Sequence, residues 1–594
     1  MELLLLLVEQ RGALVSRELI VERIWGSGVF LDTDNSINGA IRKIRQALKD
    51  DPDDPHFVQT VPGKGYRFIA SAVRSEVEPP APASAAVTSE PPALVETKPL
   101  RRPGAVISAI AVVLIGALAT YAYWSRLRST PQTPERLMLA VLPFENLTGD
   151  PAQDYFSDGM TEEMITQLGR INPDRVGVIA RTSVMNYKAS RQPMDQISRE
   201  LGAQYLLEGS VRRDGDRVRI TAQLIQAKDK TTIWAQQYDR EIKDLLALQS
   251  DIAQKISQEI QSALGDHEKH AAAQTSSPRP VESEVYDLYL KGLYCWNKRT
   301  SEGLEQAIKY FQAATVKDPS YARAWAGLAD SYALLGGYTG VSASDYMSQA
   351  RSAAQRALEL DNSLPEAHTA LALVVQNYDY DWQTSETEFK RAIELDPNYA
   401  TAHHWYAEHL MWQGRFEEAL RESERARLLD PLSLIIAADN GVILLYARQY
   451  DRAITKFRSV LELDPGFSRA QMLRHAYIEK GMFPEAMAQT APFKGAPWYW
   501  AEMAAINGRD GHKLEAQRAL KRLLDLRARQ RVDPMIMAYA YVSMGNKPES
   551  ISYLEEAYTW RSSDLICIKV DPAYDSLRDD PRFRALLGRM GLSG

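Results

Sequence analysis

Cysteine is scarce in this chain, and neither sign of charge dominates it. Among 594 residues there are two cysteines, Cys295 and Cys567, and the formal net charge is −7 at pH 7. Two thiols are too few for a disulfide framework and lack the spacing of a zinc site, so we expect two independent thiols, with a pairing as the alternative. The near-balance of charge excludes a chain that is basic throughout, but it leaves room for a locally basic element.

Motifs of catalysis and cofactor binding are also missing. The glycines of Pro62-Gly63-Lys64-Gly65 lack the spacing of a phosphate-binding loop, and the sequence has neither a His-Glu-x-x-His motif nor a Gly-x-Ser-x-Gly elbow. Glu162 and Glu163 are adjacent carboxylates near an expected helix N-terminus, where acidic residues favour the helix macrodipole. We therefore predict no enzyme activity, no cofactor and no metal site.

One group of histidines invites a metal interpretation. His403, His404 and His409 occur with Glu408 in the stretch AHHWYAEHL. Separations of five and six residues scatter the imidazoles around a helix instead of gathering them on one face. We expect this stretch to be the first helix of a repeat, with the histidines on its surface.

The opening stretch, MELLLLLVEQ, imitates the apolar core of an export signal. Glu2 stands where a signal peptide has positive residues, and no small-residue cleavage site follows. The apolar run is also too short to span a membrane. We expect a buried helix with Leu3, Leu4 and Leu7 on its inner side.

Two consecutive segments predict a linker and a membrane span. Residues 75–103 contain seven prolines and many alanines, which is typical of an extended linker. Residues 104–124 carry no charge, lie between pairs of arginines and end in aromatic residues. Because about 20 apolar residues cross the hydrocarbon core, we expect one transmembrane helix here, with a buried helix of a large core as the alternative.

The rest of the chain divides into an α/β region and a repeat region. Residues 136–264 alternate buried strands such as LMLAVLPF with helices and finish in a strand meander, which predicts an α/β or α+β domain. Residues 284–594 are helical, and an acidic turn phrase recurs at Asp361, Asp396, Asp430 and Asp464 with a spacing of 34 or 35 residues. That period predicts a tetratricopeptide-repeat solenoid, whose C-terminal repeats are degenerate beyond residue 470.

The motif with the most functional content lies in residues 35–49. An apolar stripe at helical spacing comprises Ile37, Ile41, Ile44 and Leu48, and a polar stripe comprises Asn38, Arg42, Arg45 and Lys49. Arginine can present a bidentate fork to guanine and asparagine to adenine, while basic residues neutralise phosphates. Downstream, FVQTV and YRFIA flank a glycine-rich turn with Lys64 at its tip, which predicts a hairpin.

Helix, turn, helix and hairpin together predict a winged helix-turn-helix over residues 1–74, with double-stranded DNA as its partner. The competing interpretation is a solvated charged helix face, because residues 1–74 contain ten basic and ten acidic residues. The stretch from SRELIVERIWG to GKGYRF resembles the OmpR/PhoB-type winged-helix effector domain. The resemblance implies a recognition helix in which Asn38, Arg42 and Arg45 face the major groove, with Lys43 as a further contact. It also implies a wing around Lys64, with Arg67 at its base.

Two further resemblances extend this interpretation. The effector family has strands before its first helix, so the domain is expected to be N-terminally truncated and Met1 to be an internal methionine. With the apolar segment, the chain resembles ToxR/CadC-like regulators, which implies a single-pass protein of the inner (cytoplasmic) membrane with a cytoplasmic N-terminus and periplasmic C-terminal domains. The stretches VLPFENLTGDPAQDYFSDGMTEEMITQL and WAQQYDRE resemble a TolB-like amino-terminal domain.

The expected function is therefore a membrane-bound transcriptional regulator. Its winged helix would bind DNA, and its TolB-like and repeat domains would bind a protein or peptide. Self-association into a homodimer would place two winged helices on linked half-sites and raise their affinity through effective concentration. The rival is an envelope scaffold whose truncated winged helix no longer binds DNA.

Overall fold

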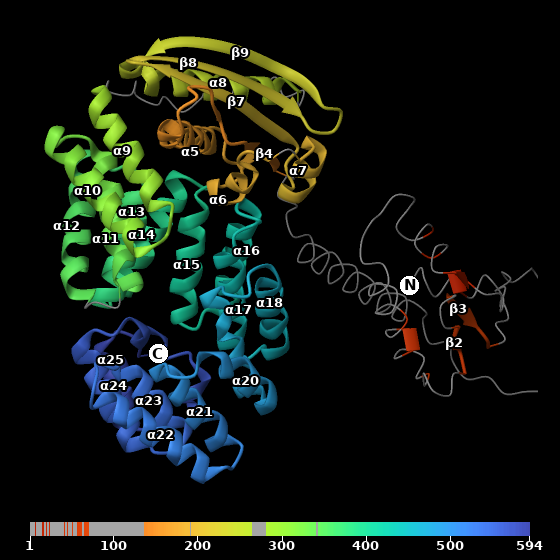
Figure 1. The fold of residues 1–594 in the computed structure, drawn as a ribbon, viewed down its shortest axis with the longest axis vertical. Coiled ribbons are helices and arrows are strands. Elements are labelled where there is room, and N and C mark those ends of the chain that lie inside the picture. Colours follow the sequence, from red (N-terminus) through yellow and green to blue (C-terminus); the bar gives the residue numbers. More distant parts are fainter. Residues whose placement is uncertain are drawn as a thin grey trace, which may run out of the picture. The chain divides into compact units, whose positions relative to one another are not determined.

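The computed structural model of the chain describes residues 6–7, 15–16, 20, 23, 41, 44–45, 50, 56–61, 65–70, 136–190, 192–263, 281–339 and 343–593. The chain forms two compact units, Met1–Ala119 and Thr120–Gly594. Figure 1 traces both of them along the chain.

The first unit contains a three-stranded antiparallel sheet in the order β1-β3-β2. Strands β2 (Val58–Val61) and β3 (Gly65–Phe68) form the hairpin that the sequence predicts, with Val58 opposite Phe68. The short strand β1 (Val15–Ser16) adds to β3, a pairing that sequence reasoning missed. The apolar core beneath the sheet contains Leu7, Ile20, Ile41, Val58 and Tyr66. Leu7 is fully buried, as expected for the opening run, whereas Leu3 and Leu4 lie outside the described residues.

The second unit begins with an α/β domain, as residues 136–264 predict. Its sheet has the order β6-β4-β7-β8-β9, and β5 pairs with β7. Strand β4 is parallel to both β6 and β7, whereas β7, β8 and β9 form the expected antiparallel meander. The strands are β4 (Leu137–Val141), β5 (Glu145–Asn146), β6 (Val176–Val178), β7 (Tyr205–Asp214), β8 (Arg217–Gln226) and β9 (Thr231–Glu241). The helices are η1 (Pro151–Gln153), α5 (Asp154–Arg170), α6 (Arg181–Val184), η2 (Met185–Tyr187), α7 (Met194–Leu201), η3 (Ile242–Asp244) and α8 (Leu245–Ala263).

The remaining described residues form a solenoid of antiparallel helix pairs. Its first part comprises α9 (Ser283–Trp296), α10 (Ser301–Lys317), α11 (Ala322–Thr339), α12 (Ala343–Leu360), α13 (Pro365–Val374), η4 (Val375–Asp379), α14 (Trp382–Leu395), α15 (Ala400–Trp412), α16 (Phe416–Leu429), α17 (Leu434–Tyr446) and α18 (Tyr450–Leu463). The second part comprises η5 (Ser468–Met472), α19 (Leu473–Lys480), α20 (Phe483–Thr490), η6 (Ala491–Phe493), α21 (Pro497–Arg509), α22 (Lys513–Arg527), α23 (Pro534–Ser543), α24 (Lys547–Trp560), η7 (Ser563–Cys567), η8 (Pro572–Leu577) and α25 (Pro581–Arg589). Cys295 and Cys567 are free thiols, as expected.

Small residues decide how closely the solenoid helices approach. A Cβ atom added to Gly292 or to Gly327 would lie 2.5 Å from the ring of Phe311, so one aromatic fills the space left by two glycines. Gly441 has the same relation to Phe457 in a later repeat. Because such distances are shorter than any contact between carbon atoms, larger residues here would force the helices apart. The alternation of small and aromatic residues thus sets the repeat geometry.

The α/β domain packs against the solenoid (Figure 1), and two of the recurring acidic turns, those of Asp396 and Asp430, lie at the contact. The side chain of Asn398 donates to the carbonyl oxygens of Gly169 (2.7 Å) and Val176 (3.1 Å). At the following acidic turn of the solenoid, that of Asp430, the backbone N–H of Ala180 donates to the carbonyl of Leu429 at 2.7 Å. These buried bonds join the α/β domain and the repeats into one body.

The C-terminal segment, residues 561–593, closes the solenoid on itself. The indole N–H of Trp382 donates to the carbonyl of Met590 at 2.7 Å, and the guanidinium of Arg561 donates to the carbonyl of Tyr378 at 2.8 Å. Between these contacts, η7 and η8 belong to the apolar core formed by the later repeats. The degenerate end of the repeat region therefore folds back onto α14.

The structure corrects the expected fold class and localisation at one point. Among the described residues, no helix has the length and apolar character that a membrane crossing requires. Helix α8, for example, has 19 residues, but Asp251, Lys255 and Glu259 interrupt it. The expected transmembrane helix and the inner-membrane localisation that depended on it are therefore not supported. Residues 75–103 and 104–124 lie outside the described residues, and an apolar composition alone does not establish a spanning helix.

Candidate nucleic-acid interface

The N-terminal unit holds its hairpin in place through one carboxylate. The side chain of Asp50 accepts hydrogen bonds from the backbone N–H groups of His56 (2.6 Å), Phe57 (2.9 Å) and Val58 (2.8 Å). Burial of this carboxylate acts to raise its pKa, but the three backbone donors and the charge of Arg45 outweigh it and lower the pKa. An ionised Asp50 therefore fixes where strand β2 begins. Sequence reasoning missed this residue, which is the first of an acidic run, DDPDD, after the predicted recognition helix.

Arg45 lies on the predicted recognition helix and contacts the same strand. One terminal nitrogen of its guanidinium donates to the carbonyl of Val58 at 2.7 Å and to the hydroxyl of Thr60 at 2.9 Å. Ile41 and Ile44 pack into the core from the same helix. Arg45 thus ties the helix to the hairpin, and that nitrogen is already engaged within the protein.

Arg67 is the other predicted DNA contact that the structure describes. It lies in β3 opposite Gln59 and is half-buried. Its Nε atom is buried and has no hydrogen-bond partner among the described residues. The remaining predicted contacts, Asn38, Arg42, Lys43, Lys49 and Lys64, lie outside the described residues.

The histidines of α15 are buried, so the prediction that they lie on the surface is wrong. His403 contacts Glu422 at 2.7 Å, and His409 contacts the side-chain oxygen of Gln376 at 2.7 Å. His404 contacts Asp439 of α17 at 2.8 Å. The three imidazoles thus face three different partners, as their spacing predicts, but each faces the protein interior, because the helix packs between two neighbouring repeats.

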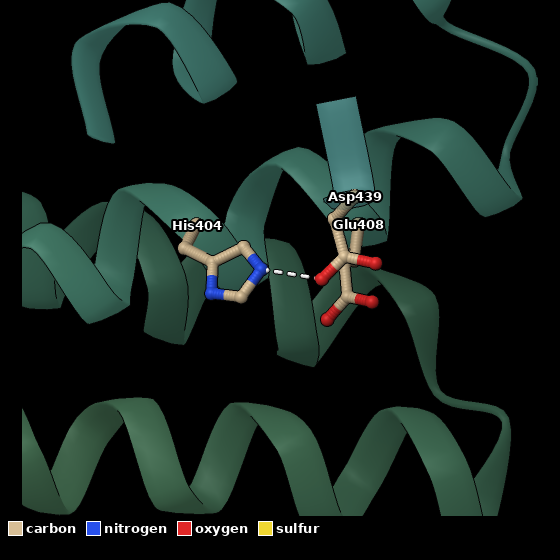
Figure 2. Close-up of side chains that lie close together, drawn as sticks. All are labelled: His404, Glu408 and Asp439. Carbon is tan, nitrogen blue, oxygen red and sulfur yellow. Dashed lines mark hydrogen bonds and ion pairs between the residues drawn. The ribbon is translucent and has the colours of Figure 1, made fainter. Parts of the chain in front are cut away.

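Figure 2 shows the one arrangement of these residues that resembles a metal site, with His404, Glu408 and Asp439 close together. One ligand atom from each lies within 4.8 Å of the others. However, Arg469 of η5 donates to Glu408 at 3.1 Å and forms an ion pair with Asp439 as well. A guanidinium already pairs with both carboxylates and would repel a cation, so the geometry fits a buried ion network better than a metal site.

Comparisons with known proteins identify three parts of the chain. Residues 1–68 match the family described as "Transcriptional regulatory protein, C terminal", and residues 135–255 match "HilA/YgeH-like transcriptional regulator, second domain". Residues 298–340 and 381–430 match "Tetratricopeptide repeat". The chain therefore has the domain composition of a transcriptional regulator with an OmpR/PhoB-type DNA-binding domain. Where a TolB-like domain was expected, the match is to the HilA/YgeH second domain.

Individual relatives include named regulators and one protein named as a cyclase. The transcriptional regulator HilA of Salmonella typhimurium is 22% identical over 452 residues, which is 76% of this chain and 68% of HilA. A protein of Rhizobium meliloti named "Putative adenylate cyclase 3" is 35% identical over 252 residues, 41% of each chain. The transcriptional regulatory protein YrkP of Bacillus subtilis is 39% identical over 69 residues, 12% of this chain and 30% of YrkP. The chain thus spans less than half of the named cyclase.

Proposed function

We propose that this chain regulates transcription by binding double-stranded DNA through residues 1–74, while its α/β and repeat domains bind a protein or peptide partner. The observation that carries this proposal is the match of residues 1–68 to a transcriptional-regulator domain, together with a hairpin that packs on the helix carrying Arg45. A helix beside a hairpin is the arrangement by which a winged domain contacts both a groove and the adjacent backbone.

The DNA contacts in this proposal have two kinds of role. Asn38 and Arg42 would contact base edges, and Lys43, Lys49 and Lys64 would contact phosphates. Arg67 would donate to a phosphate near the base of the hairpin. Arg45, whose guanidinium is bonded to β2, would act mainly by holding the helix and the hairpin at the correct angle.

The repeat domain is the proposed partner-binding part. Solenoids of this kind present an extended inner surface on which peptides bind. The α/β domain is fixed to the repeat edge through Asn398 and Ala180, so a partner bound to either would contact one rigid body. We also propose that a partner acts by changing self-association, because two linked winged domains bind adjacent half-sites more tightly than one.

A gel-shift assay with the full chain tests the DNA-binding proposal. Genomic fragments bound by the wild type would be selected first, and their retention by Arg42→Ala and Lys521→Ala then compared. Lys521 lies exposed on α22 and is the control. Arg42→Ala should weaken specific DNA binding about tenfold or more, because the variant loses a base contact and a positive charge near the phosphates. The control should bind as the wild type does.

Two further results test the positioning role of Arg45 and distinguish DNA binding from the scaffold alternative. If Arg45 positions the hairpin, Arg45→Ala should weaken specific and non-specific DNA binding together and speed hydrogen exchange in β2. If the folded wild-type chain retains no fragment at low salt, the DNA-binding proposal is wrong and the scaffold function takes its place. Sedimentation of the protein–DNA complex then gives the number of chains bound, and one chain per site would exclude the dimer.

A further inference from the structure

A basic pocket lies where the C-terminal segment meets the solenoid. It has a volume of about 460 Å³. Phe416 contributes from the start of α16 and Arg448 from the turn that follows α17. The C-terminal segment contributes Lys569, Arg578, Arg584 and Leu587. The pocket therefore exists only when the segment after α24 is docked on the repeats, and its volume is within the range of small-molecule sites.

The pocket has an excess of positive charge that the described protein does not balance. Four basic side chains line it and no acidic one does among the described residues. Arg448 and Arg578 both pair with the same carboxylate oxygen of Asp575, at 2.7 Å and 2.5 Å. No ion pair joins Lys569 or Arg584 to any carboxylate in the described part of the chain. One carboxylate thus pairs with two of the four cations, and the other two have no ion-pair partner among the described residues.

Lys569 is half-buried beside another of these cations, Arg578. Burial lowers the pKa of its ammonium group, and the neighbouring charge of Arg578 lowers it further. Arg584 is exposed and donates to the backbone carbonyl of Asp579 at 2.9 Å, and no carboxylate among the described residues pairs with it. Clustered cations that lack counter-charges disfavour one another, and an anion between them removes that penalty.

Two of the basic residues also maintain the wall of the pocket. Arg448 donates to the carbonyl of Val570 at 2.7 Å, and Arg578 donates to the carbonyl of Lys569. The other side of the pocket is apolar, with Phe416 and Leu587 among its lining residues. An occupant that matches both sides has an anionic end and an apolar or aromatic body.

We propose that this pocket binds a small organic phosphate, with the phosphate between Lys569 and Arg584 and the apolar part against Phe416 and Leu587. Phosphate is favoured over a carboxylate because several nitrogen donors from different directions suit a tetrahedral dianion with three free oxygens. Because both the repeats and the C-terminal segment contribute to the pocket, the ligand stabilises the closed solenoid by mass action.

Isothermal titration calorimetry of the full chain with phenyl phosphate tests this proposal. Binding should be tighter for phenyl phosphate than for inorganic phosphate, which lacks the apolar body, and benzyl alcohol should not bind. The variant Lys569→Met/Arg584→Met should bind phenyl phosphate at least about tenfold more weakly, because each charged hydrogen bond lost has about that effect. The control variant Lys521→Met/Arg522→Met removes one lysine and one arginine from the exposed surface of α22.

Hydrogen exchange gives a second readout of ligand binding that does not require a measurable heat of binding. Phenyl phosphate should slow exchange in residues 565–592 of the wild type and of the control, and not of the pocket variant. Thermal unfolding without ligand establishes that both variants are folded. Failure of phenyl phosphate to bind at millimolar concentration, or equal affinity in the pocket variant and the wild type, overturns the proposal. DNA binding by residues 1–74 is measured separately, so the two proposals fail independently.

Discussion

The hydroxyl of Ser183 in the α/β domain donates to the carboxylate of Asp430 in the solenoid at 2.6 Å. The same hydroxyl oxygen accepts the backbone N–H of Leu432 at 2.9 Å. Ser183 is fully buried and Asp430 nearly so. Asp430 is one of the recurring turn aspartates, so the repeat motif itself supplies the docking point for the neighbouring domain.

The first prediction concerns the loss of the Ser183 hydroxyl. Ser183→Ala leaves the buried carboxylate of Asp430 and the N–H of Leu432 with one partner fewer each. Burial raises the pKa of Asp430 and the Ser183 hydrogen bond lowers it, so the variant carboxyl should take up a proton more readily. We expect a loss of about 1–3 kcal/mol in the free energy of unfolding, measured by urea denaturation. Ser352→Ala, on the exposed face of α12, is the control, and equal stability of the two variants would contradict the prediction.

The second prediction concerns a buried ion pair between the same two domains. Glu163 of α5 pairs with Arg323 of α11 and also accepts the hydroxyl of Tyr289 at 3.1 Å. Glu163→Gln would leave a mostly buried guanidinium without its paired carboxylate, at a cost of up to about 3–5 kcal/mol. Denaturant unfolding measures this cost. Glu394→Gln removes an exposed pair with Arg391 and should cost less than about 0.5 kcal/mol; a similar small loss for Glu163→Gln would show that the buried pair contributes little.

The third prediction tests closure of the solenoid. Gly591 has a φ of +66°, and a Cβ atom there would lie 3.0 Å from both Trp382 and the carbonyl of Tyr380. Gly591→Ala should therefore cost at least about 1–2 kcal/mol and speed hydrogen exchange in α25. Gly588, in the same helix, has open space around its Cβ position. Gly588→Ala should leave exchange unchanged or slow it, and the reverse order of the two variants would contradict the closure described above.

The fourth prediction is a pH dependence. Burial lowers the pKa of His409 to about 4, and this imidazole is fully buried. Unfolding returns the pKa to about 6.5, so the unfolded chain binds a proton that the folded chain excludes between these values. The contribution of His409 to stability is present above pH 6.5 and is lost as the pH falls through about 4, at most about 3 kcal/mol.

Urea denaturation between pH 7 and pH 4 measures that loss. His409→Gln, which cannot take up a proton, should unfold with a shallower decrease in stability over this range than the wild type. His512→Gln is the control, because the imidazole of His512 is largely exposed. Parallel curves for the wild type and His409→Gln would mean that His409 titrates alike in both states.

The sequence alone determined the local elements of this protein. The period of 34 residues predicted the helix pairs, and the glycine-rich turn between two β-branched stretches predicted the hairpin of β2 and β3. These features depend on contacts between residues a few positions apart, which a linear pattern records directly. An apolar segment, by contrast, records only composition, and the membrane span inferred from it was the part of the fold class that required correction.

Only the tertiary structure decided what the equivalent turns do. Asp464 accepts the backbone N–H of Gly466 within its own turn, whereas Asp430, in the same local phrase, accepts the hydroxyl of Ser183. The sequence does not distinguish the two, because the difference arises from the superhelix, which places one turn beside α6. Likewise, the sequence predicted Arg45 as a DNA contact, but one nitrogen of its guanidinium donates to the carbonyl of Val58, 13 residues away in the chain. Long-range contacts follow from how the elements pack, and a local pattern carries no record of them.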